Sequence, residues 1–199
     1  GAVHARTGMT YYRRAIHTPG TVLMQPAALA RGLGESLPKN VSFYENTPVL
    51  EIDYGSKVIA ITKGGKITAD RCILAVNGFA PFLGHLKRKI FTIQAFASMT
   101  RALTDDEQAA LGHPADWGLV PAMAFGGPTM RYTMDKRLVM RSFWGKRQSD
   151  VVRSVEYRRS RDLQLRQIRD RFPMIQGDPI VDTWTGQLGL ASNFAPGFG

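Results

Sequence analysis

The sequence contains a single cysteine, Cys72, among its 199 residues. One cysteine excludes an internal disulfide framework and a metal site built from cysteines. Because Cys72 stands within an apolar run, we expect an inert thiol buried in the core. A chain without disulfides is typical of a reducing compartment, so the sequence predicts a cytoplasmic protein.

Long apolar runs and grouped metal ligands are also lacking. No run approaches the roughly 20 residues that cross a bilayer, and nothing near Gly1 resembles a secretory signal. The histidines are scattered without the spacing of metal ligands; they are His4, His17, His85 and His113. No Ser/His/Asp or Cys/His arrangement stands out. The sequence therefore predicts no membrane span and no metal site, and it identifies no catalytic residue.

Positive charge is abundant, with 26 basic against 16 acidic residues and a formal net charge of +10. Much of the excess lies in residues 153–171, where apolar residues recur at helical spacing. This pattern predicts a helix with a solvated basic outer face, and nucleic-acid binding through that helix is the alternative. Because the basic residues are not interleaved with aromatic ones, we expect no nucleic-acid partner.

The order of the predicted elements is mixed α+β. Helices are expected over residues 25–33, after the N-capping Thr104, and over 153–171. Strands are expected at residues 40–45, 49–52, 58–62, 70–75, 90–103, 130–133, 138–143 and 180–184, with a possible short strand near 119. Residues 1–16 show no clear period, and 185–199 read as a loop.

The apolar run at residues 73–76 has the composition of a strand buried on both faces, as in a parallel sheet. A glycine directly after such a strand, here Gly78, lets the backbone approach a ligand at the carboxyl end of the sheet. An ordinary buried strand followed by a turn explains the same residues.

Four stretches together resemble the FAD-dependent oxidoreductases of the D-amino-acid oxidase superfamily, in particular the branch with gamma-glutamylputrescine oxidoreductase and glycine and sarcosine oxidases. They are PGTVLMQPAALARGL (19–33), YENTPVLEI (44–52), ITADRCILAVNGFAP with the hairpin before it (58–81), and the run from RFPMI (171–175) through VDTWTGQLGLASNFAPGFG (181–199). The resemblance implies an antiparallel substrate-binding sheet with flanking helices, plus part of a flavin-binding α/β domain. It divides the chain into a partial FAD-binding region (1–85), a substrate-binding sheet with the arginine-rich helix (86–184) and the start of a return segment (185–199).

The chain departs from the family in one respect. Members carry a GxGxxG turn that holds the flavin pyrophosphate, and this sequence contains none. The expectation is therefore an internal piece of a longer enzyme, which by itself is inactive and binds FAD weakly or not at all.

The resemblance also implies site residues. Those expected to bind the cofactor are Pro48, Val49, Ala75, Asn77, Gly78, Trp184 and Gly186. Those expected to bind the substrate are Arg131, Tyr132 and Gln187. The resemblance implies that main-chain groups of Val49 contact the adenine of FAD. Gln187 belongs to a turn that is often followed by an arginine in the family.

Arg131 and Tyr132 could hold a substrate carboxylate. Alternation along a strand sends their side chains to opposite faces, so only one is expected to line a pocket. A surface arginine and a core tyrosine are the alternative.

The function implied is oxidation of a C–N bond in a small amine or amino acid by hydride transfer to FAD. The alternative is a non-enzymatic module that binds a small ligand or a protein on the same sheet. The sequence does not indicate the oligomeric state of the protein.

Overall fold

The computed structural model describes residues 2–121, 127–146 and 152–195. The chain forms two compact units, each built around its own sheet. The first comprises Gly1–Leu23 and Ile93–Leu188, and the second comprises Met24–Thr92 and Gly189–Gly199. Residues 1–23 thus belong to the unit that holds most of the predicted substrate-binding sheet. The predicted roles of the three sequence regions remain predictions.

The first unit is organised by a five-stranded sheet in the order β5-β6-β7-β4-β8. The strands are β4 (Ile90–Thr100), β5 (Trp117–Leu119), β6 (Thr129–Tyr132), β7 (Leu138–Lys146) and β8 (Ile180–Ala191). β5 pairs antiparallel with β6, β6 with β7, and β7 with β4. The α+β class and the 130–143 hairpin are confirmed.

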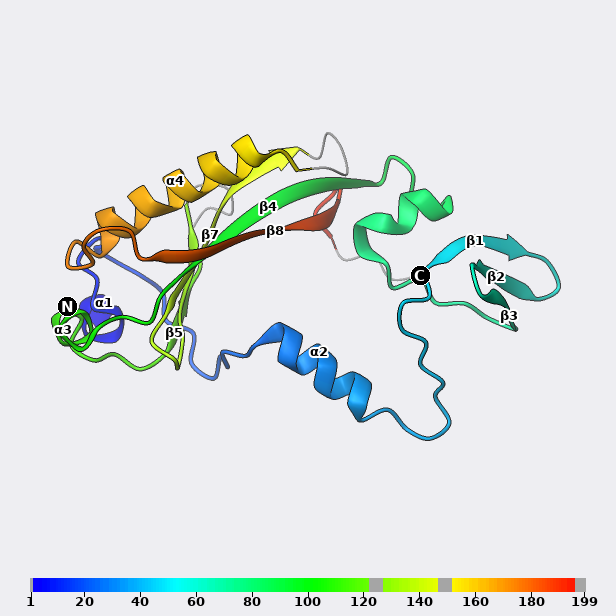
Figure 1. Cartoon of the computed structure of the whole chain (residues 1–199), viewed down its shortest axis with the longest axis horizontal. Coiled ribbons are helices and arrows are strands. Elements are labelled where there is room, and N and C mark those ends of the chain that lie inside the picture. Colours follow the sequence, from blue (N-terminus) through cyan, green and yellow to red (C-terminus); the bar gives the residue numbers. More distant parts are fainter. Residues whose placement is uncertain (1, 122–126, 147–151, 196–199) are drawn as a thin grey trace. The chain divides into compact units, whose positions relative to one another are not determined.

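One helix, α4 (Ser154–Arg171), lies along one face of this sheet (Figure 1). Its Ile168, together with Phe172 just beyond its end, joins core residues of β6 and β7. The strand side chains that enter this core alternate along the chain, as period-2 geometry requires; they are Met130, Tyr132, Leu138 and Met140. The helix predicted over 153–171 is confirmed.

Two short helices complete the first unit, α1 (Ala2–Thr7) and α3 (Asp105–Ala110). α3 begins with the predicted N-cap: Thr104 and Glu107 form a capping box. Residues 1–16 show no clear period in the sequence, yet α1 forms there and Met9 behind it is fully buried.

Tertiary contacts hold this N-terminal segment. The guanidinium of Arg171 lies 4.0 Å from the ring centroid of Tyr11, and its Nε donates to the hydroxyl of Tyr12.

The second unit contains an antiparallel sheet of β1 (Val49–Tyr54), β2 (Val58–Thr62) and β3 (Gly65–Ala69). It also contains α2 (Pro26–Glu35) and a 3₁₀ helix, η1 (Asn77–Leu83). Gln25 caps α2, with its side-chain oxygen accepting from the amides of Ala27 and Ala28. The helix predicted after residue 25 and the strands predicted at 49–52 and 58–62 are confirmed.

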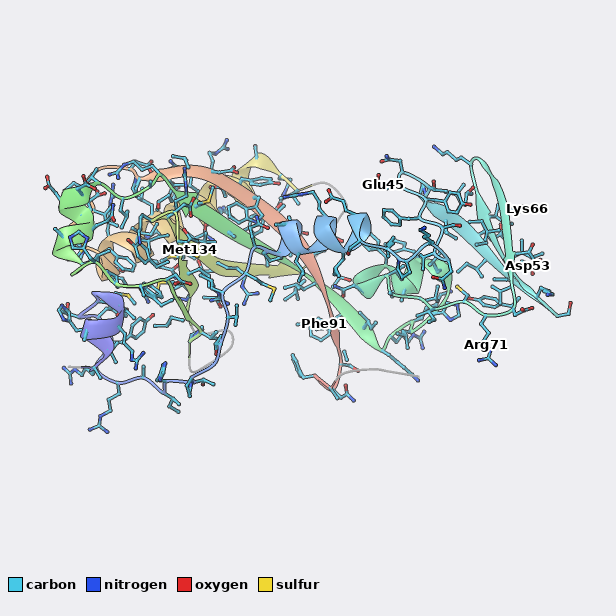
Figure 2. The ribbon with its side chains drawn as sticks, turned by 90° about the horizontal axis from the view of Figure 1, so that it is seen from below. Glu45, Asp53, Lys66, Arg71, Phe91 and Met134 are labelled. Carbon is cyan, nitrogen blue, oxygen red and sulfur yellow. The ribbon has the colours of Figure 1, made fainter. Side chains whose placement is uncertain are left out.

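Several local predictions in this unit are wrong. Residues 40–45 form no strand, and the strand expected at 70–75 ends at Ala69. The hairpin closes directly after β2, pairing Thr62 with Gly65, so β3 starts earlier than expected. Arg71 projects away from the strands that precede it (Figure 2).

The apolar run after β3 is consequently not buried on both faces. Ile73 is 92% exposed, and Cys72 is exposed rather than enclosed in a core. A run of apolar residues becomes a buried strand only where neighbouring strands accept its backbone hydrogen bonds. Within the described residues, no strand pairs with 70–76.

β8 is longer than the sequence predicts. It continues through residues 185–191, which read as a loop because of their glycines.

Candidate functional site

The face of the five-stranded sheet that points away from α4 carries the polar side chains of interest. Residues paired across antiparallel strands share a face. Because Met130 and Met140 pair and lie in the core beside α4, their neighbours along each strand belong to the other face. We call this surface the distal face; its members are Ala97, Met99, Gly118, Thr129, Arg131, Val139 and Arg141.

Arg131 lies across the short strand β5 on the distal face. It pairs with Gly118, and a Cβ at that glycine would lie 3.2 Å from both Cδ and Nε of Arg131. Its Nη1 donates to the carbonyls of Met130 (2.8 Å) and Leu119 (3.4 Å). The guanidinium is therefore held over β5 by backbone oxygens, and glycine leaves the room it occupies.

Arg141 is a second cation on the same face. It pairs with Thr129, and its Nη2 donates to that hydroxyl at 3.1 Å. Burial and then the positive charge of Arg131 hold the pKa of Arg141 below its usual range.

Tyr132 lies on the α4 side of the sheet, with 1% of its surface exposed. Its ring stacks on Trp117 at 6.1 Å between centroids, and burial raises the pKa of its hydroxyl. Alternation therefore separates Arg131 from Tyr132, and the tyrosine is in the core position that the sequence left open. Contact of Arg131 with a substrate remains a prediction.

β8 presents Trp184 opposite to α4. The neighbouring Thr183 hydroxyl lies 2.8 Å from that of Ser98, which donates to Gln164 of α4. Since Thr183 faces the helix, Trp184 points the other way; it is 40% exposed.

Gly186 follows on the same side of β8 as Trp184, and a Cβ there would meet nothing within 4 Å. Gln187 is half-buried, and within the described residues its Oε1 has no hydrogen-bond partner.

A buried polar network fixes the shape of the sheet beneath the distal face. β7 has a bulge opposite Ala95 and Phe96 of β4, which pair with Trp144 and Ser142, and the regular ladder of hydrogen bonds is interrupted there. The fully buried Gln164 donates through Nε2 to the carbonyls of Phe96 (2.9 Å) and Ser142 (3.2 Å). α4 therefore supplies a hydrogen-bond donor to these two carbonyls at the bulge.

In the second unit, the turn at Asn77–Gly78 is tied to the end of β8. The side-chain oxygen of Asn77 accepts from the amide of Gly189 at 2.9 Å. A Cβ at Gly189 would lie 2.7 Å from the amide nitrogen and Cα of Gly78. These contacts explain why glycine occupies positions 78 and 189. The two backbones touch, so Gly78 is buried, and the side chain of Asn77 is already hydrogen-bonded within the protein.

The other predicted cofactor residues of this unit are accessible. Pro48, Val49 and Ala75 are exposed, so their main-chain and apolar atoms can contact a planar ligand. In the first unit Trp184 and Gly186 are exposed as well. Asn77 and Gly78, by contrast, have a structural part in the turn. Contacts of the exposed positions with a flavin dinucleotide remain predictions.

Metal chemistry finds no support in the described ranges. They contain no group of three or more His, Cys, Asp or Glu side chains placed to hold an ion. Likewise, none of the helices in the described part of the chain is both long and apolar enough to cross a membrane.

The sequence reasoning did not single out Arg141 or Gly118. The signal was present: once the hairpin turn at residues 133–137 is placed, Tyr132 pairs with Leu138, and the register then pairs Thr129 with Arg141. The place of Gly118 depended on pairing between β5 and β6, which no local pattern indicates.

Comparison with known proteins agrees with the observed architecture. A family model described as FAD dependent oxidoreductase matches residues 2–199. The chain is 27% identical to the probable oxidoreductase OrdL of Rhizobium meliloti (strain 1021) over 199 residues, covering 94% of this chain and 42% of OrdL.

Two solved structures share the fold. The glycine oxidase of Geobacillus kaustophilus superposes with a TM-score of 0.58 at 20% identity, over 77% of this chain and 39% of that enzyme. The glycine oxidase of Bacillus cereus ATCC 14579 gives 0.57 at 17% identity, over 77% and 40%. The chain thus spans about two fifths of the length of these relatives. Since the family model covers nearly every residue, the chain belongs to the DAO family of FAD-dependent oxidoreductases.

Proposed function

We propose that this chain supplies the substrate-facing sheet of a flavoenzyme that oxidises a C–N bond in a small amine or amino acid. The observation that carries the proposal is the distal face, with its cations and Trp184 nearby on β8, in a chain that the FAD-dependent family matches from residue 2 to 199. Glycine oxidases share its fold, which favours a substrate that contains an amine.

The reaction that we propose balances as follows. A hydride leaves the carbon that bears the nitrogen, the nitrogen lone pair forms the C=N bond, and the amine proton passes to solvent. FAD, when bound, supplies the two-electron acceptor for the hydride. Water then hydrolyses the imine to a carbonyl compound and the released amine.

In this proposal, the residues of the chain orient the substrate and limit the access of water. Arg131 is fixed by two carbonyls, so its remaining N–H groups point in a set direction without further ordering. Trp184 offers an apolar surface against which a ligand can pack. Gln164 acts through the sheet, because it donates to the carbonyls of Phe96 and Ser142 at the bulge between β4 and β7.

In the second unit, accessible backbone and apolar atoms at Val49 and Ala75 would contact the cofactor. We also propose a cytoplasmic location, which the single exposed and unpaired Cys72 supports.

The experiment is anaerobic reduction of the FAD-loaded protein at its natural length by a panel of amines and amino acids. We expect loss of the oxidised-flavin absorbance with at least one compound. A protein that takes up no FAD, or whose flavin no amine or amino acid reduces, would refute the proposal. Such a result would favour a module that binds ligands without chemistry.

A further inference from the structure

We infer that a patch of basic and apolar side chains on the second unit binds the surface of a membrane that contains anionic lipids. The inference goes beyond the proposed function and does not depend on it, because it concerns where the protein is held and not what it oxidises. We call this surface the basic–aromatic patch; its members are Leu86, Lys87, Arg88, Lys89, Phe91 and Phe194.

The loop before β4 is held at both ends by contacts within the second unit. At its start, Nε2 of His85 lies 2.5 Å from the hydroxyl of Tyr54 on β1, and the two rings meet edge to face. At its end, the carbonyl of Lys89 accepts from the amide of Ser192 at 2.9 Å. Between these two anchors, residues 86–89 are all exposed.

The backbone of this loop is left-handed at two residues that are not glycine. The angle φ is 53° at Leu86 and 64° at Arg88, a conformation that is unfavourable for a residue with a Cβ. The amide of Lys89 donates to the carbonyl of Leu86 at 3.0 Å and closes the turn. Backbone strain of this kind clusters at sites where a protein binds a partner.

The charge around the loop has one sign. Residues 71–103 contain no Asp or Glu, and neither do residues 183–199. Among the ion pairs of the described residues, none involves Lys87, Arg88 or Lys89. Three adjacent cations without acidic partners attract a negatively charged surface, and the anionic lipids of a cytoplasmic leaflet present one.

Apolar side chains lie beside these cations. Phe91 and Phe194 meet edge to face with 6.0 Å between their ring centroids. They are 42% and 65% exposed, and Leu86 is 49% exposed. At a membrane interface, apolar side chains enter the boundary of the acyl chains while basic ones stay at the headgroups. The three apolar side chains carry no hydrogen-bonding group, which favours hydrocarbon over the bases of a nucleic acid.

The test is cosedimentation of the FAD-loaded protein at its natural length with lipid vesicles. The vesicles consist of phosphatidylcholine alone, or of phosphatidylcholine mixed with the anionic phosphatidylglycerol. One variant removes the charge of the loop by combining Lys87→Gln, Arg88→Gln and Lys89→Gln. A second variant, Phe194→Ser, removes an apolar member and keeps the charge.

The matched control removes the same charge from exposed positions of α4 by combining Arg158→Gln, Arg159→Gln and Arg166→Gln. It should bind vesicles as the wild type does, because charges more than about 10 Å from the membrane are screened at moderate salt.

We expect the wild-type protein to bind the anionic vesicles and to bind phosphatidylcholine much more weakly. Each basic residue near an anionic membrane changes the affinity about fivefold, so the triple loop variant should bind about 100-fold more weakly. Phe194→Ser should weaken binding about fivefold through the lost apolar burial. High salt should remove the difference between wild type and the triple loop variant, whereas the effect of Phe194→Ser should persist.

Thermal unfolding without lipid checks that the variants fold, and we expect the triple loop variant to have the Tm of the wild type because the replaced side chains are exposed. A wild-type protein that does not sediment with anionic vesicles would overturn the inference. Equal losses in the loop variant and the α4 control would also overturn it, because the net charge alone would then explain binding. Normal vesicle binding by Phe194→Ser with a lowered Tm would show that the patch packs within the protein or against a second copy, and would contradict the inference as well.

Discussion

Replacing Gln164 by leucine tests the role of the buried network between α4 and the sheet. Gln164 is fully buried, and its Nε2 donates to the carbonyls of Phe96 and Ser142. Leucine would leave both carbonyls without this donor in a region that water does not reach. Each buried group left unsatisfied costs about 1–3 kcal/mol, so we expect the free energy of unfolding to fall by roughly 2–6 kcal/mol. Ser98 keeps a partner, because its hydroxyl also contacts Thr183.

The matched control for this prediction is Gln167→Leu, the same change three residues along α4. The Oε1 of Gln167 is buried and has no hydrogen-bond partner within the described residues. Leucine there removes an unsatisfied oxygen, so we expect stability to stay constant or to rise slightly.

Urea unfolding followed by circular dichroism gives both free energies. The reasoning is refuted if Gln164→Leu costs no more than Gln167→Leu, because the network would then contribute nothing beyond packing.

Two further predictions concern other contacts. Gly189→Ala should lower the free energy of unfolding by about 1–3 kcal/mol, because its Cβ would lie 2.7 Å from Asn77 Oδ1. The control is Gly186→Ala on the same strand, whose Cβ would meet nothing within 4 Å, so its stability should not change. Equal effects of the two substitutions in thermal unfolding would contradict this prediction. Hydrogen bonds from Arg101 lower the pKa of Glu107 from its ordinary 4.5. The ionised Glu107 therefore stabilises the fold above pH 4.5, and this contribution is lost as the pH falls through the pKa of the folded state. The difference in Tm between wild type and Glu107→Gln should accordingly vanish in acid. A difference that persists at all pH values would contradict a stabilising ion pair.

The sequence predicted those elements whose signals are local. The capping residues of α3, the turn between β6 and β7 and the apolar spacing of α4 each lie within a few residues of the element they define. Such signals do not depend on distant strands, and the structure confirms them.

Predictions failed where a distant partner decides the outcome. The run at residues 73–76 has the composition of a buried strand, yet Ile73 is 92% exposed because no described strand pairs with it. Conversely, Gly186 and Gly189 suggested a loop, but β8 continues through them. Gly189 is needed where the backbone touches Gly78, more than 100 positions earlier in the chain.

The candidate site shows the same division. Alternation along β6 was enough to predict that Arg131 and Tyr132 point to opposite faces. Which face the helix covers could not be read from the strand itself, because that depends on how α4 packs against the sheet. The pairing of Arg131 with Gly118 likewise comes from the contact between β5 and β6.

The measurement that tests the central claim most directly is a single anaerobic turnover of the FAD-loaded protein with an amino acid that reduces its flavin, followed by quantification of the products. The account predicts equal amounts of reduced flavin and of the carbonyl compound derived from the amino acid. Flavin reduction without that carbonyl compound, or no reduction by any amine or amino acid, would contradict the claim that this sheet serves the oxidation of a C–N bond.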